Sequence, residues 1–340
     1  MRINICFATD ENYLKYMGTT IVSILTSAKF EDKLYFYILC NNVSDKSKEY
    51  ISNLKRFKNF EIKFIDVDIN EFEKFPAGGA HITNTTYYRY KIAQLCPEID
   101  KIIYLDCDTV VKSSLSDLFS EDLAGYYLAG VEDVGYSYWR NIEPKYTIKG
   151  FYINAGVLLI NLNEWRKNNL ADKLINYTLE HKEEIAIGDQ DVINIVCKGK
   201  IKSLDYKYNA QDTYYRQYPE VMANRNKTNI LKAAKNPVII HYTASVKPWN
   251  NFSMNRCVDW CKPYLIMTSG EEDNGLQMRA KLCLWEELHD RINECIFAHS
   301  KIRLKDKILS LKAEYDHWVI RLLGFKIKFK KLKHRKGIKC

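Results

Sequence analysis

Residues 101–108 read Lys-Ile-Ile-Tyr-Leu-Asp-Cys-Asp, an apolar run that ends in two aspartates separated by one residue. The apolar run predicts a buried strand, which delivers both carboxylates at its carboxyl end. Ligands of open α/β sheets bind at that edge of the sheet. The segment therefore predicts an α/β fold whose functional site includes Asp106 and Asp108.

Outward from this segment, apolar runs typical of strands alternate with apolar residues at helical spacing. Further strands are predicted at residues 3–8, 34–39, 61–67, 127–131 and 155–162. Helices are predicted at residues 17–25, 46–57, 88–95 and 164–180. Successive βα units favour a Rossmann-like, mixed but mostly parallel sheet with flanking helices.

The charge of the chain is concentrated at its C-terminal end. The chain has a net charge of +9, but residues 301–340 hold fourteen Lys or Arg and three acidic residues, which leaves −2 for the remainder. A nearly neutral body of ordinary globular composition is not expected to bind nucleic acid. Eight Lys or Arg fall between 326 and 339 with no acid. This amphipathic segment favours docking of residues 318–340 on an anionic membrane surface, with a solvated tail or nucleic-acid binding as alternatives.

The chain is expected to hold a catalytic domain over residues 1–268 and a helical, basic extension over 275–340. Apolar residues recur at helical spacing within 278–292 and 304–322, and residues 269–274 read as a linker. The N-terminus lacks a signal-peptide pattern, and no apolar run reaches the length of a spanning helix. These features predict a cytoplasmic protein with reduced cysteines, peripherally bound to the inner face of the membrane.

Two carboxylates on one turn can hold a hard cation such as Mg²⁺ or Mn²⁺. Such an ion neutralises the charge that develops on a departing diphosphate. His241 ends another apolar run and is a candidate third ligand, and Lys247 offers a cation to the same phosphates. Taken alone, the Asp-x-Asp pattern is also compatible with turn or capping residues.

Two further polar clusters lie at predicted strand-to-helix junctions or helix starts. Asp10 and Asn12 follow the first strand and can hydrogen-bond a base or ribose, although Asp10 is equally suited to cap the next helix. Asp189 and Gln190 open an apolar helix, and capping accounts for only one polar residue there. We expect this pair to bind sugar hydroxyls and to stabilise positive charge at the anomeric carbon.

Six segments together resemble glycosyltransferase family 8, which includes lipopolysaccharide galactosyl- and glucosyltransferases and glycogenin-like proteins. In chain order they are FATDENY, HITNTTYYRYKI, IIYLDCDTVV, NAGVLLINLNEWR, GDQDVIN and HYTASVKPW, spread over roughly residues 1–250. The resemblance implies a nucleotide-sugar transferase fold of GT-A type, a Mn²⁺ or Mg²⁺ ion and a UDP-hexose donor, glucose or galactose. It also implies retention of the anomeric configuration and a role in lipopolysaccharide or cell-surface glycan synthesis.

The resemblance assigns roles to residues by position. Metal binding falls to Asp106, Asp108 and His241. Binding of UDP and the donor sugar falls to Ala8, Thr9, Asp10, Asn12, Arg89, Asp106, Asn154, Asp189, Gln190 and Lys247. Contacts to the saccharide or lipid-linked acceptor fall to His81, Thr86 and Asp133. Gln190 and Asp189 are the catalytic candidates, and because an amide is a poor nucleophile, a front-face reaction without a covalent intermediate is expected.

Two other functions remain open from the sequence. Residues 105–110 also look like the first motif of haloacid-dehalogenase-like phosphatases, with Asp106 as nucleophile and Asp108 as general acid. That alternative leaves the N-terminal and His241 segments unexplained. A sugar- or membrane-binding protein of the same fold without turnover is the second alternative, and Ala244, where family members often have glycine, is its only support.

Overall fold

The computed structural model of this chain describes residues 1–76, 84–139, 151–215, 221, 224–243 and 247, with three strands between 309 and 330. The chain divides into two compact units, Met1–Cys283 and Leu284–Cys340. The expected domains at 1–268 and 275–340 stay a prediction. His81, Ala244 and the predicted linker and helix at 269–292 lie outside the described residues.

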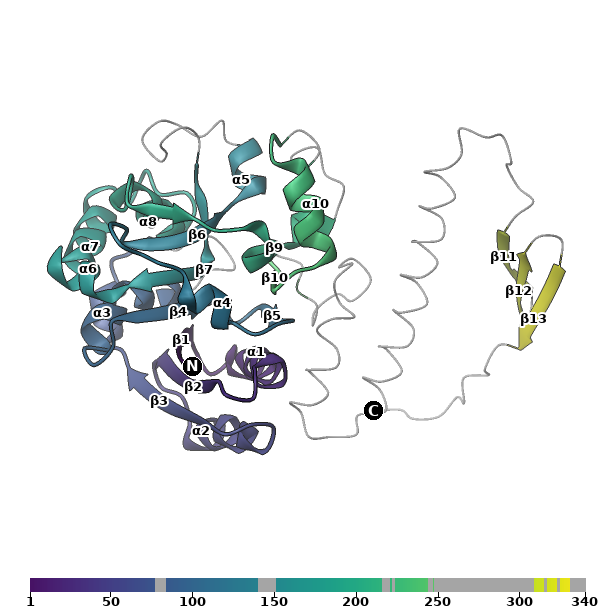
Figure 1. Ribbon diagram of the computed structural model, residues 1–340, viewed down its shortest axis with the longest axis horizontal. Helices are drawn as coiled ribbons and strands as arrows, with labels where there is room; N and C mark the ends of the chain where they lie inside the picture. The colour runs from purple at the N-terminus through teal and green to yellow at the C-terminus, as the bar shows by residue number, and fades with distance from the viewer. Residues whose placement is uncertain are drawn as a thin grey trace. The chain divides into compact units, whose positions relative to one another are not determined.

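The first unit contains a seven-stranded sheet in the order β3-β2-β1-β4-β7-β6-β8 (Figure 1). Its strands are β1 (Arg2–Thr9), β2 (Lys33–Cys40), β3 (Phe60–Asp66), β4 (Lys101–Leu105), β6 (Leu128–Glu132), β7 (Ile153–Asn161) and β8 (Ile201–Ser203). The pairs among β3, β2, β1 and β4 are parallel, β7 is antiparallel to both of its neighbours, and β8 is parallel to β6. The predicted mixed, mostly parallel sheet is therefore confirmed.

Helices cover both faces of this sheet because its central strands are apolar on both sides. Ile3, Ile5 and Phe7 of β1 pack with α1 and α2, whereas Cys6 and Ala8 face the opposite layer. One layer holds α1 (Leu14–Ser27) and α2 (Asp45–Ser52), and the other holds α3 (Ile92–Leu95), α6 (Leu162–Lys167), α7 (Leu170–Glu180) and α8 (Gly188–Val196). Strands buried on both faces read as continuous apolar runs, as observed here.

Three predicted helices are interrupted in the structure, and one of them, expected at 46–57, is α2 followed by the 3₁₀ turn Asn53–Arg56. The segment expected as one helix over 164–180 is α6 followed by α7, because Asn169 between them has a left-handed backbone with φ of 49°. The segment expected at 88–95 is mainly a 3₁₀ helix, Asn84–Lys91, followed by α3. Further helices among the described residues are α4 (Ser116–Ser120), α5 (Val134–Trp139), α10 (Lys227–Lys235) and the 3₁₀ turns Ile69–Phe72, Tyr206–Asn209 and Asp212–Tyr215.

A small second sheet joins the carboxyl edge of the large one to the late part of the chain. Its order is β5-β10-β9, with β5 (Thr109–Val111), β10 (Ile239–His241) and β9 (Ala210–Gln211). The antiparallel register of β5 and β10 places His241 opposite Thr109, one residue after Asp108. No short-range pattern in the sequence predicts this pairing.

The strand order reverses between β1 and β4, since the chain adds β2 and β3 on one side of β1 before it returns to form β4 on the other. Ligands bind outside such a switch point in doubly wound sheets. The Cys107 thiol donates to the Ala8 carbonyl oxygen over 3.4 Å, so the loops that follow β1 and β4 lie in contact. Asp106 and the N-terminal loop thus share the expected edge.

The second unit contradicts the helix predicted over 304–322. The three strands β11 (Leu309–Glu314), β12 (His317–Leu322) and β13 (Phe325–Lys330) form an antiparallel sheet. Apolar and polar residues alternate through LSLKAE and FKIKFK, which is the period of a strand. The helical interpretation counted only the apolar residues spaced three or four apart and overlooked this alternation.

None of the helices in the described part of the chain combines the length and the apolar character needed to cross a lipid bilayer.

The turn that carries the two aspartates is hydrogen-bonded to a side chain of α1. The buried Thr20 hydroxyl lies 3.1 Å from the Cys107 carbonyl oxygen and 2.7 Å from that of Thr109. We expect Thr20→Val to lower the free energy of unfolding by about 1–3 kcal/mol, because the buried carbonyls lose their donor. Urea denaturation followed by circular dichroism measures this change.

Thr26→Val is the matched control on the same helix. Thr26 is exposed and its hydroxyl bonds only to the backbone of α1 among the contacts described, so its loss is expected to change stability by less than about 0.5 kcal/mol. Equal stabilities of the two variants would contradict the role given to Thr20.

Candidate functional site

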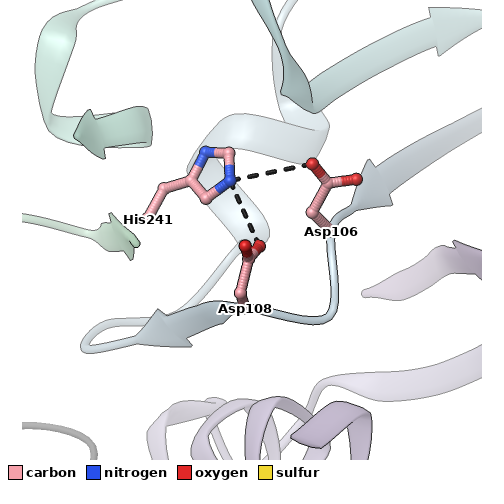
Figure 2. Close-up of side chains that lie close together, drawn as sticks. All are labelled: Asp106, Asp108 and His241. Carbon is pink, nitrogen blue, oxygen red and sulfur yellow. Dashed lines mark ion pairs between the residues drawn. The ribbon is translucent and has the colours of Figure 1, made fainter. Parts of the chain in front are cut away.

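Asp106, Asp108 and His241 form a compact cluster at the switch point. The His241 Nε2 atom lies 3.2 Å from Asp108 Oδ1 and 3.7 Å from Asp106 Oδ2. One ligand atom from each residue falls within 4.8 Å of the others. Figure 2 shows the imidazole facing both carboxylates, with Asp106 and Asp108 on the loop after β4 and His241 on β10. The structure thus brings together the three residues that the sequence predicted as metal ligands.

The cluster fits a divalent cation. Asp108 Oδ1 is buried and has no hydrogen-bond partner among the described residues. Two carboxylates and one imidazole supply the oxygen and nitrogen ligands that suit Mn²⁺. Mg²⁺ prefers oxygen ligands, so it would be bound mainly by the two carboxylates. A buried carboxylate oxygen without a donor is costly, and a bound cation would satisfy it.

Lys247 closes the cluster on the side of Asp108. Its Nζ lies 2.5 Å from Asp108 Oδ2 and donates to the Tyr242 carbonyl oxygen over 2.6 Å. Burial disfavours the ionised Asp108, but Lys247 and His241 outweigh it, so the pKa of this carboxyl is lowered. Burial likewise opposes the charge of Lys247, and the contact with Asp108 raises its pKa. The predicted phosphate-binding lysine therefore lies against the candidate metal site.

A buried arginine balances the other carboxylate. Arg89 lies 3.0 Å from Asp106 Oδ1 and 3.0 Å from Asp189 Oδ2, and it donates to the Ala155 carbonyl oxygen over 2.5 Å. Thr86 donates to Asp189 as well. Burial raises the pKa of Asp189 to about 6, although Arg89 and Thr86 favour the ionised form. The arginine expected along the nucleotide thus orients two carboxylates of the site.

The predicted sugar-binding amides lie together. Asn154 Nδ2 donates to Gln190 Oε1 and to Asp133 Oδ2, each over 3.2 Å. Gln190 Nε2 donates to the same Asp133 oxygen over 3.1 Å. Asp133, expected on the acceptor side, therefore shares one hydrogen-bonded group with both amides. Thr86, also expected on the acceptor side, contacts Arg89 and Asp189.

Only two polar side chains at the start of α8 face the site. Asp191 accepts from the backbone N–H groups of Ala186 and Ile187, each over 2.8 Å, and from the Tyr152 hydroxyl over 2.6 Å. It therefore fastens the loop before the helix. The N-cap of α8, Ile187, has no side-chain cap, so the expected capping role is replaced by this contact of Asp191 with the loop, and Asp189 and Gln190 contact the other site residues.

The N-terminal loop lies beside the cluster and is held in place by hydrogen bonds to the start of α2. Ala8 and Thr9 are buried at the end of β1, and Asn12 is exposed. Asp10 Oδ1 accepts from the Tyr13 N–H over 2.9 Å in the turn directly before α1, whose N-cap Tyr13 has no side-chain cap. Glu11, which the sequence analysis did not single out, accepts from Ser44 and Ser47 at the start of α2.

Gly156 of β7 is a second residue that the sequence analysis missed. A Cβ atom at this position would lie 2.0 Å from His241 Cε1 and 2.6 Å from Asp106 Oδ2. The Gly156 carbonyl oxygen also accepts from the Asp106 N–H over 2.8 Å. Only glycine leaves room for the imidazole, and its place in the segment NAGVLLIN was the one available signal.

The mixed, mostly parallel sheet thus carries two carboxylates and an imidazole at its switch point. The family model for glycosyl transferase family 8 matches residues 4–253, and the chain belongs to that family. The predicted resemblance is therefore confirmed. Membership of this family makes the protein a glycosyltransferase.

Relatives and solved structures agree with this assignment. General stress protein A of Bacillus subtilis is 32% identical over 256 residues, which cover 73% of this chain and 88% of the relative. Lipopolysaccharide 1,2-glucosyltransferase of Escherichia coli is 26% identical, with 80% of each chain covered. The structure of galactosyltransferase LgtC in complex with donor and acceptor sugar analogs aligns with a TM-score of 0.69 and 28% identity, over 79% of this chain and 96% of that one. The GT-A fold is thereby confirmed.

We expect Gly156→Ala to weaken Mn²⁺ binding at least about 10-fold, because the added methyl group displaces His241 or Asp106 from the common centre. Electron paramagnetic resonance titration of free Mn²⁺ measures the affinity. Gly135→Ala is the control, since the nearest atoms to its Cβ lie at ordinary contact distances of 3.6 and 3.7 Å. Wild-type affinity in Gly156→Ala would show that the crowding is relieved without moving the ligands.

Proposed function

We propose that this protein is a metal-dependent, retaining hexosyltransferase. It moves glucose or galactose from a UDP-hexose to a saccharide or lipid-linked glycan acceptor, within lipopolysaccharide or cell-surface glycan synthesis. The observation that carries the proposal is the cluster of Asp106, Asp108 and His241 at the switch point of a family 8 fold.

The cation would be held by these three side chains and, when bound, neutralises the charge that develops on the departing diphosphate. Lys247 supplies a second positive charge beside Asp108 and binds the same phosphates. Ala8, Thr9, Asp10 and Asn12 line the nucleotide, on a loop that Glu11 fastens to α2. Uracil and ribose would therefore lie over the carboxyl end of β1.

The donor sugar lies between the arginine network and the amides. Asp189 and Gln190 face it from α8, and Asn154 faces it from β7. Arg89 acts by holding Asp106 and Asp189 in place, which links the metal ligand to the sugar site. His81, Thr86 and Asp133 contribute to the acceptor side.

Retention of the anomeric configuration is what the family resemblance implies, and the chemistry of Gln190 favours one route to it. Its Oε1 accepts hydrogen bonds from Asn154 Nδ2 and from the Ala155 N–H, so both lone pairs of this oxygen are occupied. An amide held in this way does not form a covalent glycosyl intermediate. The bond between the anomeric carbon and the phosphate oxygen breaks, the acceptor oxygen attacks from the same face, and its proton passes to the leaving phosphate.

The phosphatase alternative loses its support. The chemistry of that family usually starts from the first strand, whereas Asp106 here follows β4, and Arg89 and His241 engage the carboxylates that would have to attack phosphate. The alternative of a binder without turnover makes a separate prediction, since it allows donor binding without release of UDP.

We expect UDP release from UDP-glucose or UDP-galactose to require Mn²⁺ or Mg²⁺ and to fall at least about 100-fold in Asp108→Asn and in His241→Ala, because charge stabilisation of the leaving diphosphate is lost. A coupled UDP assay with and without chelator measures this. Asp117→Asn, an exposed position on α4, is the control expected to keep wild-type turnover.

Two outcomes would contradict the proposal. Undiminished UDP release in chelator would remove the metal from the reaction. Orthophosphate release from phosphomonoesters without any UDP release would instead support the phosphatase.

We also propose that the second unit docks on the anionic inner face of the cytoplasmic membrane, with the enzyme in the cytoplasm. In β13, Lys326, Lys328 and Lys330 alternate with Phe325, Ile327 and Phe329, so the lysines fall on one face of the strand. Basic residues near anionic lipid each contribute about 1 kcal/mol before non-additivity is discounted.

Replacing all three lysines of β13 by glutamate keeps the alternation of the strand and reverses its charge. We expect this variant to lose binding to vesicles that contain phosphatidylglycerol while it retains UDP release in solution. Co-sedimentation measures binding, and vesicles of phosphatidylcholine alone serve as the control. Equal binding of variant and wild type to anionic vesicles would exclude docking through this face.

A further inference from the structure

Asn209 stands between the candidate metal ligand His241 and the amide Asn154. It is fully buried at the end of the 3₁₀ turn Tyr206–Asn209, directly before β9. Its Oδ1 lies 3.0 Å from His241 Nδ1, and its Nδ2 donates to Asn154 Oδ1 over 2.9 Å. Neither the predicted site residues nor the family segments quoted above include Asn209.

The direction of these hydrogen bonds is set by the backbone of β7. The Gly156 N–H donates to Asn154 Oδ1 over 3.0 Å, and a backbone N–H can only donate. The Asn154 atom at this position is therefore its oxygen. The Asn209 atom that faces the same oxygen must then be the NH₂ group, which leaves the Asn209 oxygen to face the imidazole.

An independent contact gives the same orientation of Asn154. The Ala155 N–H donates to a side-chain atom of Gln190, which must be Oε1. That oxygen faces Asn154 Nδ2, so Asn154 presents its NH₂ group to Gln190 and its oxygen to Asn209. The pairing of β6 and β7 shifts register between Gly130 and Val131, from Leu158 to Asn154, which leaves both backbone N–H groups outside that ladder.

The orientation of Asn209 decides the tautomer of a neutral His241. An oxygen facing Nδ1 requires the proton to be on Nδ1, which leaves the Nε2 lone pair directed at the two carboxylates. In the other tautomer the proton on Nε2 would lie between His241 and Asp108 Oδ1, 3.2 Å away, where a cation has to bind. The imidazole proton therefore lies on Nδ1, the nitrogen on the side away from the candidate metal position.

We propose that Asn209 is a positioning residue that holds His241 in the tautomer able to bind the cation, with its own orientation fixed by the Gly156 N–H through Asn154. The inference extends the metal site of the proposed function, but it does not depend on the identity of the donor or the acceptor. Residues that orient metal-bound histidines commonly change metal affinity by 10- to 100-fold when they are removed.

The test compares Asn209→Leu with Asn209→Asp in the full chain. Aspartate keeps an oxygen that accepts from Nδ1–H, whereas leucine has a similar size and no acceptor. We expect Mn²⁺ affinity, measured by electron paramagnetic resonance without donor, to fall about 10-fold or more in Asn209→Leu and to stay within about 3-fold of wild type in Asn209→Asp. A packing role alone gives the opposite order, because a buried apolar side chain is tolerated better than a buried carboxylate.

Nitrogen NMR of the metal-free protein gives a second readout that involves no metal and no turnover. We expect Nδ1 of His241 to carry a proton in the wild type, where it faces Asn209 Oδ1, and to lose it in Asn209→Leu, where the proton lies on Nε2 and donates to Asp108. Asn161→Ala, which removes the N-cap of α6, is the control for general destabilisation and should leave both readouts unchanged.

The outcomes separate this inference from the proposed function. Unchanged Mn²⁺ affinity and an unchanged tautomer in Asn209→Leu would overturn the role of Asn209, whatever the chain does with UDP-hexoses. Loss of both in Asn209→Leu supports it, even if the wild type releases no UDP and the proposed function fails.

Discussion

The balance of charge around Asp106 and Asp108 is the interaction on which the site depends. Arg89 lies against one oxygen of Asp106, Lys247 lies against one oxygen of Asp108, and each carboxylate keeps its second oxygen directed at His241. Two carboxylates this close would otherwise repel each other and the phosphates of a donor. Because the two fixed cations satisfy only the outer oxygens, the inner pair and the imidazole remain available for a divalent ion.

This balance is built from backbone geometry as much as from side chains. The pairing of β5 with β10 brings His241 beside the turn after β4, and the missing side chain of Gly156 leaves space for its ring. The irregular pairing of β6 and β7 turns two N–H groups toward Gln190 and Asn154. Metal site, sugar site and sheet edge are therefore one connected structure, and small errors in any strand register would disturb all of them.

Local patterns in the sequence were sufficient for the large sheet and for the metal ligands, because buried strands read as apolar runs and chemistry gathers at their carboxyl ends. The resemblance added Arg89 and Asn154 and led to the family. Asn209, Gly156 and Thr20 could not be found in this way, since their importance comes from contacts between segments far apart in the chain. The strands at 309–330 were missed for another reason: a short alternating run also contains apolar residues at helical spacing.

The position of β10 in the chain has a consequence for biosynthesis. All seven strands of the large sheet are complete once Ser203 has been made, yet the imidazole follows on a strand that begins at Ile239. While the ribosome is still adding the intervening residues, a nascent chain can assemble its main core but has no third ligand to hold a metal ion. A divalent ion held by all three side chains would therefore have to await the synthesis of β10.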